Sequence, residues 1–203
     1  MTVSIGPTVP LTNPTETPTV LGAMHTLINT LVRRYELDPR APGLEDTPRR
    51  VMEMYDELLA GYKVDLEKIF TPFDAEGYSG IVIVRDIPFY SMCEHHLVPF
   101  FGVAHVGYIP RGRVVGLSKL ARVVEAFARR LQMQERMTDQ IADTLDEYLQ
   151  PNGVFVVVRA EHLCMAMRGV QRPGASTVTS AIRGQIMHDS AARSEFLSLI
   201  SRS

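Results

Sequence analysis

Apolar residues recur at helical spacing in the first part of the chain. Between residues 20 and 37 they lie three or four positions apart, which favours an amphipathic helix. A second segment of this kind follows Thr47, the expected N-cap, and Pro48, the expected first helical residue. The pattern predicts an N-terminal helical hairpin over residues 18–64. Residues 1–17 are rich in proline and threonine and lack this spacing, so we expect a disordered arm there.

The period of the pattern changes after residue 80, where several stretches rich in β-branched residues are typical of strands. Residues 118–131 and 135–150 return to helical spacing, and Ser118 is the expected N-cap of the first of these two helices. Strands interleaved with helices in this order predict an α+β domain with an antiparallel sheet over residues 65–203. The expected strands are residues 80–90, 101–110, 111–117 and 176–184, and residues 154–170 are expected to form a long strand or a hairpin.

Composition and charge exclude several classes of protein. The 203 residues, 45% of them hydrophobic, suffice for one well-buried core and a smaller helical annex. A formal net charge of −2 gives no overall basic field, so we expect no nucleic-acid partner. No apolar run reaches the ~18 residues that a membrane span needs, and the N-terminus does not resemble a signal peptide. We therefore expect a cytoplasmic protein without a membrane partner, in which both cysteines stay reduced.

Chemistry-bearing residues gather first in the stretch SMCEHHLVPF. Here Cys93, Glu94, His95 and His96 are consecutive, although the chain has only two cysteines and six histidines. The spacing C-x-x-H alone is a weak metal motif. The second half of the candidate site must therefore come from elsewhere in the chain.

The other cysteine, Cys164, lies in the stretch AEHLCMAMRGV. If this stretch is a strand, alternation places His162, Cys164, Ala166 and Arg168 on one side. The intervening apolar residues then face a core. The pattern therefore predicts a polar, chemically active strand face that carries the second cysteine.

Together, Cys93, His96 and Cys164 offer two thiolates and one imidazole, ligands that zinc accepts. Three protein ligands and one open position are typical of catalytic zinc sites, where a bound water becomes a nucleophile near neutral pH. His95 and His162 are then candidates for proton transfer. Two alternatives stay open: a structural zinc site with His95 or His162 as fourth ligand, and a Cys93–Cys164 disulfide, which a reducing compartment disfavours.

Basic residues near the same elements predict an anion-binding face. Lys119 and Arg122 lie in the first turns of the helix expected from Ser118, whose N-terminus adds a positive dipole end. Arg168 and Arg50 are further candidates for binding a polyphosphate. Glu135 starts the following helix, where it serves either as a dipole partner or as an acceptor for the N–H groups of a purine edge.

Three stretches in this order closely resemble the GTP cyclohydrolase I family: SMCEHHLVPFFGVAHVGYIP, VVGLSKLARVVEAFARRLQMQERMTDQIA, and AEHLCMAMRGVQ followed by TSAIRG. The resemblance covers residues 40–200. It implies an enzyme that converts GTP and water to formate and 7,8-dihydroneopterin triphosphate, the entry to folate and tetrahydrobiopterin synthesis. It also implies the tunnelling fold, a four-stranded antiparallel sheet with two helices on one face. The implied assembly is a ring-shaped homodecamer with active sites between subunits.

The resemblance also implies a role for each candidate site residue. Zn²⁺ is held by the two cysteines and His96, while His162 exchanges protons with the guanine ring and His95 assists. Ser118 lies near the ribose hydroxyls, and Glu135 with Gln134 grips the guanine edge. The residues implied to hold the triphosphate are Lys119, Arg122, Arg168 and Arg50.

Two other functions are weighed against this reading. A non-catalytic zinc or purine-binding module would have no use for two spare histidines and the Ser118-Lys119 pair. A zinc deaminase typically carries a C-x-x-C segment, and the chain has none.

Overall fold

The computed structural model describes residues 19–38 and 41–201, so the predicted arm at residues 1–17 lies outside the described residues. The described chain divides into two compact units, the first ending at Glu57 and the second beginning at Leu58. None of the described helices is both long and apolar enough to cross a membrane.

The first unit contains helices where the apolar spacing predicts them. They are α1 (Val20–Arg34), the short α2 (Pro42–Glu45) and α3 (Thr47–Leu58). Thr19 caps α1, accepting a hydrogen bond from the Gly22 N–H at 3.3 Å. The expected N-cap role of Thr47 is wrong, because its hydroxyl donates backwards to the Gly43 carbonyl at 2.9 Å instead of accepting from the new helix.

The second unit is built on one sheet with the strand order β5-β2-β3-β6-β7. The four long strands pair antiparallel, while the two-residue β5 adds to β2 in parallel. Their bounds are β2 (Val82–Cys93), β3 (Val98–Ile109), β5 (Leu131–Gln132), β6 (Gly153–His162) and β7 (Ser176–Gly184). The predicted α+β class with an antiparallel sheet is therefore confirmed.

Smaller elements connect the sheet to its surroundings. The stretch predicted as a short strand at 111–117 supplies only β4, which pairs with β1 in a separate two-stranded sheet. These smaller elements are β1 (Phe73–Asp74), β4 (Arg113–Val114), and the 3₁₀ turns η2 (Ala60–Lys63), η3 (Glu67–Ile69) and η4 (Gln185–His188).

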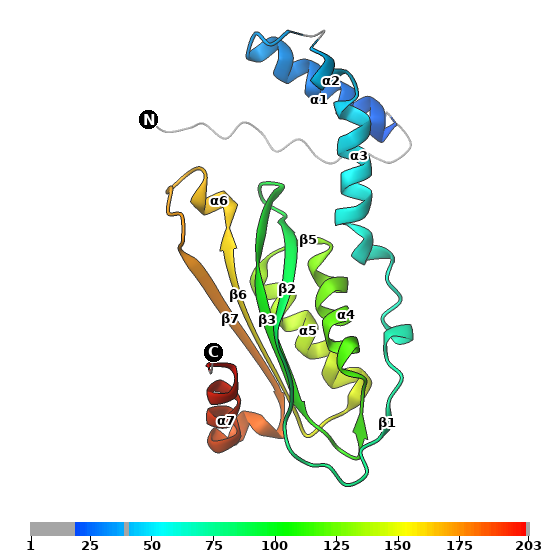
Figure 1. Ribbon diagram of the computed structural model, residues 1–203, viewed down its shortest axis with the longest axis vertical. Helices are drawn as coiled ribbons and strands as arrows, with labels where there is room; N and C mark the ends of the chain where they lie inside the picture. The colour runs from blue at the N-terminus through cyan, green and yellow to red at the C-terminus, as the bar shows by residue number, and fades with distance from the viewer. Residues whose placement is uncertain (1–18, 39–40, 202–203) are drawn as a thin grey trace, which may run out of the picture. The chain divides into compact units, whose positions relative to one another are not determined.

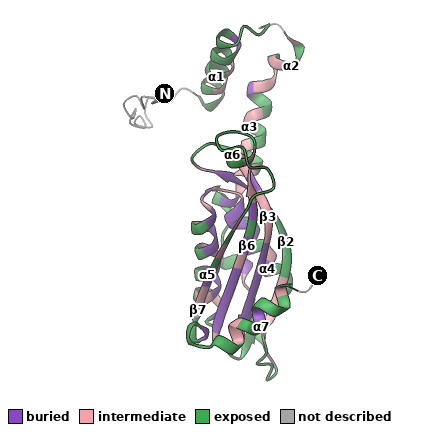
Figure 2. Ribbon diagram, turned by 90° about the vertical axis from the view of Figure 1, so that its left-hand side faces the viewer, coloured by how far each residue is buried: buried purple, intermediate pink, exposed green. Residues whose placement is uncertain are grey.

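Two helices, α4 (Leu117–Ala128) and α5 (Gln134–Leu149), cover one face of the large sheet (Figure 1). Alternation along β6 explains the resulting core. Val154, Val156 and Val158 are fully buried with the helices, whereas Phe155 points to the opposite face. There the C-terminal helix α7 (Ser190–Ser201) packs Phe196 flat on Phe155, with ring centroids 4.5 Å apart. Figure 2 shows the buried strands between these layers.

The helix α4 begins one residue before its predicted cap. Gly116 is the N-cap residue, and its carbonyl accepts from the Lys119 N–H at 2.8 Å. The expected N-cap role of Ser118 is therefore wrong, and Ser118 lies exposed in the first turn instead. The Ser118 side chain therefore does not cap the helix.

A β-bulge between Val84 and Ile87 buries an ionisable group. Asp86 adopts a positive φ of 57° there, and its N–H donates to Nδ1 of His105 at 3.2 Å. His105 is 6% exposed. Desolvation lowers the pKa of His105; the Asp86 carboxylate opposes this shift, and Arg159 and Arg85 reinforce it.

We expect stability to fall as the pH drops below about 6.5, the ordinary pKa of histidine. Because burial lowers the pKa of His105, the unfolded chain binds a proton more readily than the folded one. The stabilisation that comes from burying neutral His105 is fully present above about pH 6.5. It is lost as the pH falls from there through the lowered pKa of the folded state. Thermal melting between about pH 5 and 7 checks this, with His105→Gln as the comparison. An equal pH slope in both proteins would contradict the assignment.

Candidate metal centre

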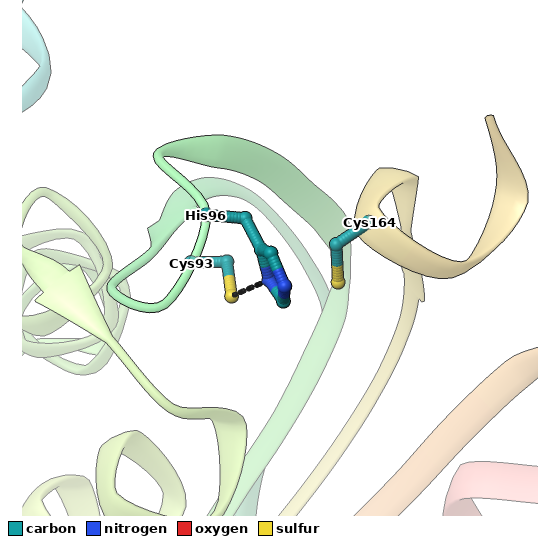
Figure 3. Close-up of side chains that lie close together, drawn as sticks. All are labelled: Cys93, His96 and Cys164. Atoms are coloured by element: carbon teal, nitrogen blue, oxygen red, sulfur yellow. Dashed lines mark hydrogen bonds between the residues drawn. The ribbon is translucent and has the colours of Figure 1, made fainter. Parts of the chain in front are cut away.

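Three potential ligands converge at one end of the large sheet (Figure 3). Cys93 is the last residue of β2 and is buried, while His96 follows in the turn to β3. Cys164 faces them from α6 (Leu163–Ala166), a single helical turn after β6. One ligand atom of each residue lies within 4.8 Å of the others, and Sγ of Cys93 is 3.7 Å from Nδ1 of His96.

Cys164 lies in a helical turn and not in the predicted strand. Strand β6 ends at His162, and the chain turns into α6 instead of continuing in the sheet. The predicted alternation of His162, Cys164, Ala166 and Arg168 on one strand face is therefore wrong. The sheet partner explains this, because β3 pairs with β6 only as far as Phe100 opposite His162. Beyond that pair the chain lacks a partner strand on β3 and forms local helical bonds.

The thiols at this centre are both free. Burial raises the pKa of the Cys164 thiol, and the nearby Cys93 raises it further. A metal ion reverses that preference, since a coordinating thiol is deprotonated outright. Two sulfurs and an imidazole brought together in this way are a group that could hold a metal ion.

The turn that carries Cys93 and His96 is held by an ion pair between Glu94 and Arg136, which the sequence pattern does not predict. Glu94 accepts a hydrogen bond from Arg136 of α5, and this lowers the pKa of the carboxyl. The same guanidinium donates to the Leu131 carbonyl and to Oε1 of Gln132, each at 3.1 Å. The Glu94 N–H donates to the Gln132 carbonyl. The turn that carries Cys93 and His96 is therefore fixed to β5 and α5.

His162 is the last residue of β6, two residues before Cys164. Its ring stacks on Phe100, its neighbour across the strands, with centroids 4.6 Å apart and planes inclined by 2°. Its Nε2 is 2.8 Å from Oε1 of Gln134. Desolvation lowers the pKa of His162, while the Glu135 carboxylate acts in the opposite direction. The structure thus brings His162, Gln134 and Glu135 together.

His95 and Arg168 complete this end of the sheet. His95 is exposed, with Nε2 3.9 Å from Oε1 of Glu94. Arg168 follows α6 and lies with one guanidinium nitrogen 3.5 Å from Nε2 of His96. Arg168 was expected on the Cys164 face of a strand, and it reaches the metal group from the loop after α6 instead.

Gln134 was predicted at the guanine edge, and that contact stays a prediction. Its side chain is buried, with the residue 1% exposed. The amide nitrogen lies 3.1 Å from the Val158 carbonyl, the Thr177 carbonyl and Oγ1 of Thr179. Glu135, by contrast, is exposed in the first turn of α5.

Ser118, Lys119 and Arg122 lie at the opposite end of the same sheet. They occupy the first turns of α4, next to Val115, whose N–H donates to the hydroxyl of Tyr108 at 3.0 Å. Tyr108 is eight residues along β3 from Phe100, about 25 Å at the rise of an extended strand. Within one chain, Lys119 and Arg122 of the predicted anion-binding face therefore do not meet the metal group, whereas Arg168 does.

Arg50 belongs to the first unit, in α3. One of its guanidinium nitrogens donates to the Gly43 carbonyl at 2.7 Å, and the other lies 3.8 Å from an Asp46 carboxylate oxygen. Its predicted contact with phosphate stays a prediction.

A family model and several relatives give the same family for this chain. The family model described as GTP cyclohydrolase I matches residues 24–201. The relative named GTP cyclohydrolase 1 from Halalkalibacterium halodurans is 62% identical over 164 residues, 80% of this chain and 87% of the relative. Proteins of the same name from Geobacillus kaustophilus and Bacillus cytotoxicus are 60% and 58% identical, with the same coverage of both chains. A solved structure, the archaeosine synthase QueF-Like in the apo form, aligns over 52% of this chain and 94% of that chain, at 20% identity and a TM-score of 0.42.

Proposed function

The chain belongs to the GTP cyclohydrolase I family, and from this premise we propose that it is a zinc-dependent enzyme of pterin synthesis. It converts GTP and water to formate and 7,8-dihydroneopterin triphosphate. The observation that carries the proposal is the meeting of two cysteines and a histidine beside His162. Three ligands beside a separate proton carrier suit metal-assisted hydrolysis better than a closed structural site.

The ligand geometry supports zinc as the metal. Tetrahedral bonds of usual length would place the two sulfurs about 3.8 Å apart, and a sulfur and the imidazole nitrogen about 3.6 Å apart. The distance from Sγ of Cys93 to Nδ1 of His96 is 3.7 Å, and the whole group lies within 4.8 Å. A small closure of the Cys164 side chain completes the site. Cys93, His96 and Cys164 are the proposed ligands.

A zinc ion held by Cys93, His96 and Cys164 would supply a water molecule activated for attack on C8 of the guanine ring. The remaining steps fall to the chain's own residues. His162 exchanges a proton with the ring nitrogen as the imidazole ring opens, and His95 assists from the adjacent turn. Hydrolysis of the opened ring releases formate. Ser118 stays near the ribose hydroxyls during the rearrangement that closes the new ring, and it comes from a neighbouring subunit, because within one chain it lies at the far end of the sheet from the metal group.

Glu135 accepts the N–H groups of the guanine edge, a geometry that carboxylates share in base recognition. Its exposure at the start of α5, within electrostatic reach of His162, supports this role. Gln134 was expected beside it, but its buried amide is already bonded. We therefore assign the guanine edge to the Glu135 side chain.

The triphosphate is held by Lys119, Arg122, Arg168 and Arg50. Because the first two lie at the far end of the sheet from the metal group, one chain alone cannot supply the whole site. This supports a homo-oligomer, a decamer by family resemblance, in which neighbouring subunits complete each active site. The tunnelling fold and the N-terminal helical hairpin, over residues 18–64, belong to the same proposal, as does the cytoplasmic location.

Product analysis tests this proposal. Purified protein is incubated with GTP, and formate release and pterin absorbance are followed together, with and without a chelator. We expect both signals, both lost with chelator and both restored by zinc. Formate without pterin would mean that ring closure fails and would direct attention to Ser118. Neither signal from folded, zinc-loaded protein would contradict the proposal and favour a non-catalytic binding module.

Loss of the metal should expose the centre to oxidation. The two sulfurs lie within 4.8 Å, so modest side-chain motion brings them to bonding distance. We expect metal-stripped protein in air to lose both free thiols, so that zinc alone no longer restores its activity. Reductant plus zinc should restore both the thiols and the activity. Thiol titration follows the reaction, and zinc-loaded protein in the same air is the control. Recovery of activity with zinc alone would contradict a Cys93–Cys164 disulfide.

A further inference from the structure

The buried side chain of Gln134 makes four polar contacts that together fix its orientation. Its amide nitrogen lies 3.1 Å from each of two backbone carbonyls, those of Val158 and Thr177, and 3.1 Å from Oγ1 of Thr179. Its amide oxygen lies 2.8 Å from Nε2 of His162. The residue is 1% exposed, so water does not compete for these groups.

The carbonyls decide which atom of the amide faces His162. A backbone carbonyl only accepts hydrogen bonds, so the NH₂ group must face Val158 and Thr177. The amide oxygen is then left facing His162, and this oxygen only accepts. Nε2 of His162 must therefore be the donor, which means that it carries a hydrogen.

The neighbouring hydroxyls agree with this direction. Oγ1 of Thr138 donates to the Gln134 backbone carbonyl at 2.7 Å. The 2.7 Å contact between the hydroxyls of Thr138 and Thr179 then runs from Thr179 as donor to Thr138 as acceptor. Oγ1 of Thr179 stays open to accept from the Gln134 amide. The two hydrogens of the Gln134 NH₂ serve the Val158 and Thr177 carbonyls, and Oγ1 of Thr179 shares one of them. Reversing the amide would set its oxygen against both carbonyls and lose both bonds.

We infer that Gln134 is a positioning residue that holds His162 in its Nε2–H tautomer and leaves Nδ1 as the nitrogen that gives and takes protons. In a neutral imidazole only one nitrogen carries hydrogen, and the partner of that nitrogen selects the tautomer. The stacking of His162 on Phe100 fixes the plane of the ring, and Gln134 fixes its rotation within that plane. The working role of Nδ1 rests on the proposed function; the tautomer does not.

Magic-angle-spinning NMR of zinc-loaded full-length protein, labelled with ¹⁵N-histidine, tests the tautomer directly. The measurement is made at about pH 8, above the ordinary histidine pKa of about 6.5. The His162 signals are assigned by their absence from His162→Gln protein. We expect a protonated Nε2 and an unprotonated Nδ1. A protonated Nδ1, or a mixture of both tautomers in the native protein, would overturn the inference, whether or not the protein turns over GTP.

Substitution separates positioning from substrate contact. In Gln134→Leu protein, we expect mixed tautomers at His162, a kcat lower by roughly 10–100-fold, and unchanged zinc content, as for other supporting residues. The KM for GTP should change by less than about threefold. A raised KM with an unchanged kcat and a single Nε2–H tautomer would show that Gln134 contacts the guanine instead.

Thr144→Val is the matched control. Thr144 is also a buried polar residue of α5, 6% exposed, ten positions beyond Gln134. We expect this protein to keep the native His162 tautomer and the native kcat. If Thr144→Val protein had a kcat as low as Gln134→Leu protein and the same mixture of His162 tautomers, the loss would reflect a general loosening of α5. The positioning role of Gln134 would then be rejected.

Discussion

Replacing Cys164 with alanine should leave the protein without bound zinc and lower GTP turnover more than 100-fold. Among the residues that the structure describes, the side chain is one of three ligand groups that meet at the centre, and it approaches from α6. Loss of a residue that merely supports a ligand costs roughly 10–100-fold, so loss of a ligand should cost more. Elemental analysis of zinc per subunit and formate release from GTP measure the two effects.

Met165→Ala is the control for Cys164→Ala. Met165 is the next residue of the same helical turn and is 40% exposed, so its loss perturbs α6 without removing a ligand. We expect native zinc content and turnover from this protein. Cys164→Ala protein with full zinc and full turnover would remove Cys164 from the ligand set.

Replacing His162 with alanine should have a different signature, in which zinc stays bound and turnover falls. General acid–base groups contribute roughly 10²–10⁴-fold to rate, and we expect a loss in that range. The imidazole lies beside the ligands but bonds to Gln134, so the metal does not depend on it. Zinc content and the rate of formate release are measured on the same samples.

His188→Ala is the matched control, because His188 is an exposed histidine in η4 that follows the last strand. It should keep both zinc and turnover. Unchanged turnover in His162→Ala protein would end the assignment of His162 as the proton carrier. Loss of zinc from that protein would instead make His162 a fourth ligand, as in a structural site.

The sequence predicts the α+β class because the spacing of its apolar residues reflects which side of each helix or strand is buried. The valines of β6 alternate between two covered faces, and the apolar stripe of α4 lies against the sheet, so each pattern has a direct physical cause. Helix ends were predicted less well. Ser118 and Thr47 are residue types that often cap helices. However, the N-cap of α4 is Gly116, and the Thr47 hydroxyl donates to the Gly43 carbonyl instead of capping α3.

The parts of the candidate site made of rare residue types could be predicted from the sequence. The parts that depend on how strands pair could not. Two cysteines in a chain of 203 residues single out Cys93 and Cys164 without any structure. The helical turn at Cys164 could not be predicted, because it results from the end of pairing between β3 and β6. The same holds for the contacts of Glu94 with Arg136 and of Gln134 with His162, whose partners lie 42 and 28 residues away in the sequence.

The anion-binding residues show a further limit. A helix N-terminus with Lys119 and Arg122 is a sound anion-binding pattern, yet its place in the sheet separates it from the metal group. A sequence pattern specifies the chemistry of a surface, but not which copy of the chain that surface serves. This is why the complete active site is proposed between subunits.

Titration of metal-free protein with zinc tests the central claim most directly. Protein stripped of metal under reducing conditions is supplied with increasing zinc, and the initial rate of formate release from GTP is measured at each step. We predict no formate before zinc is added, and a rate that rises linearly to a plateau at about one zinc per subunit, as three converging ligands require. Full formate release from metal-free protein would contradict the account.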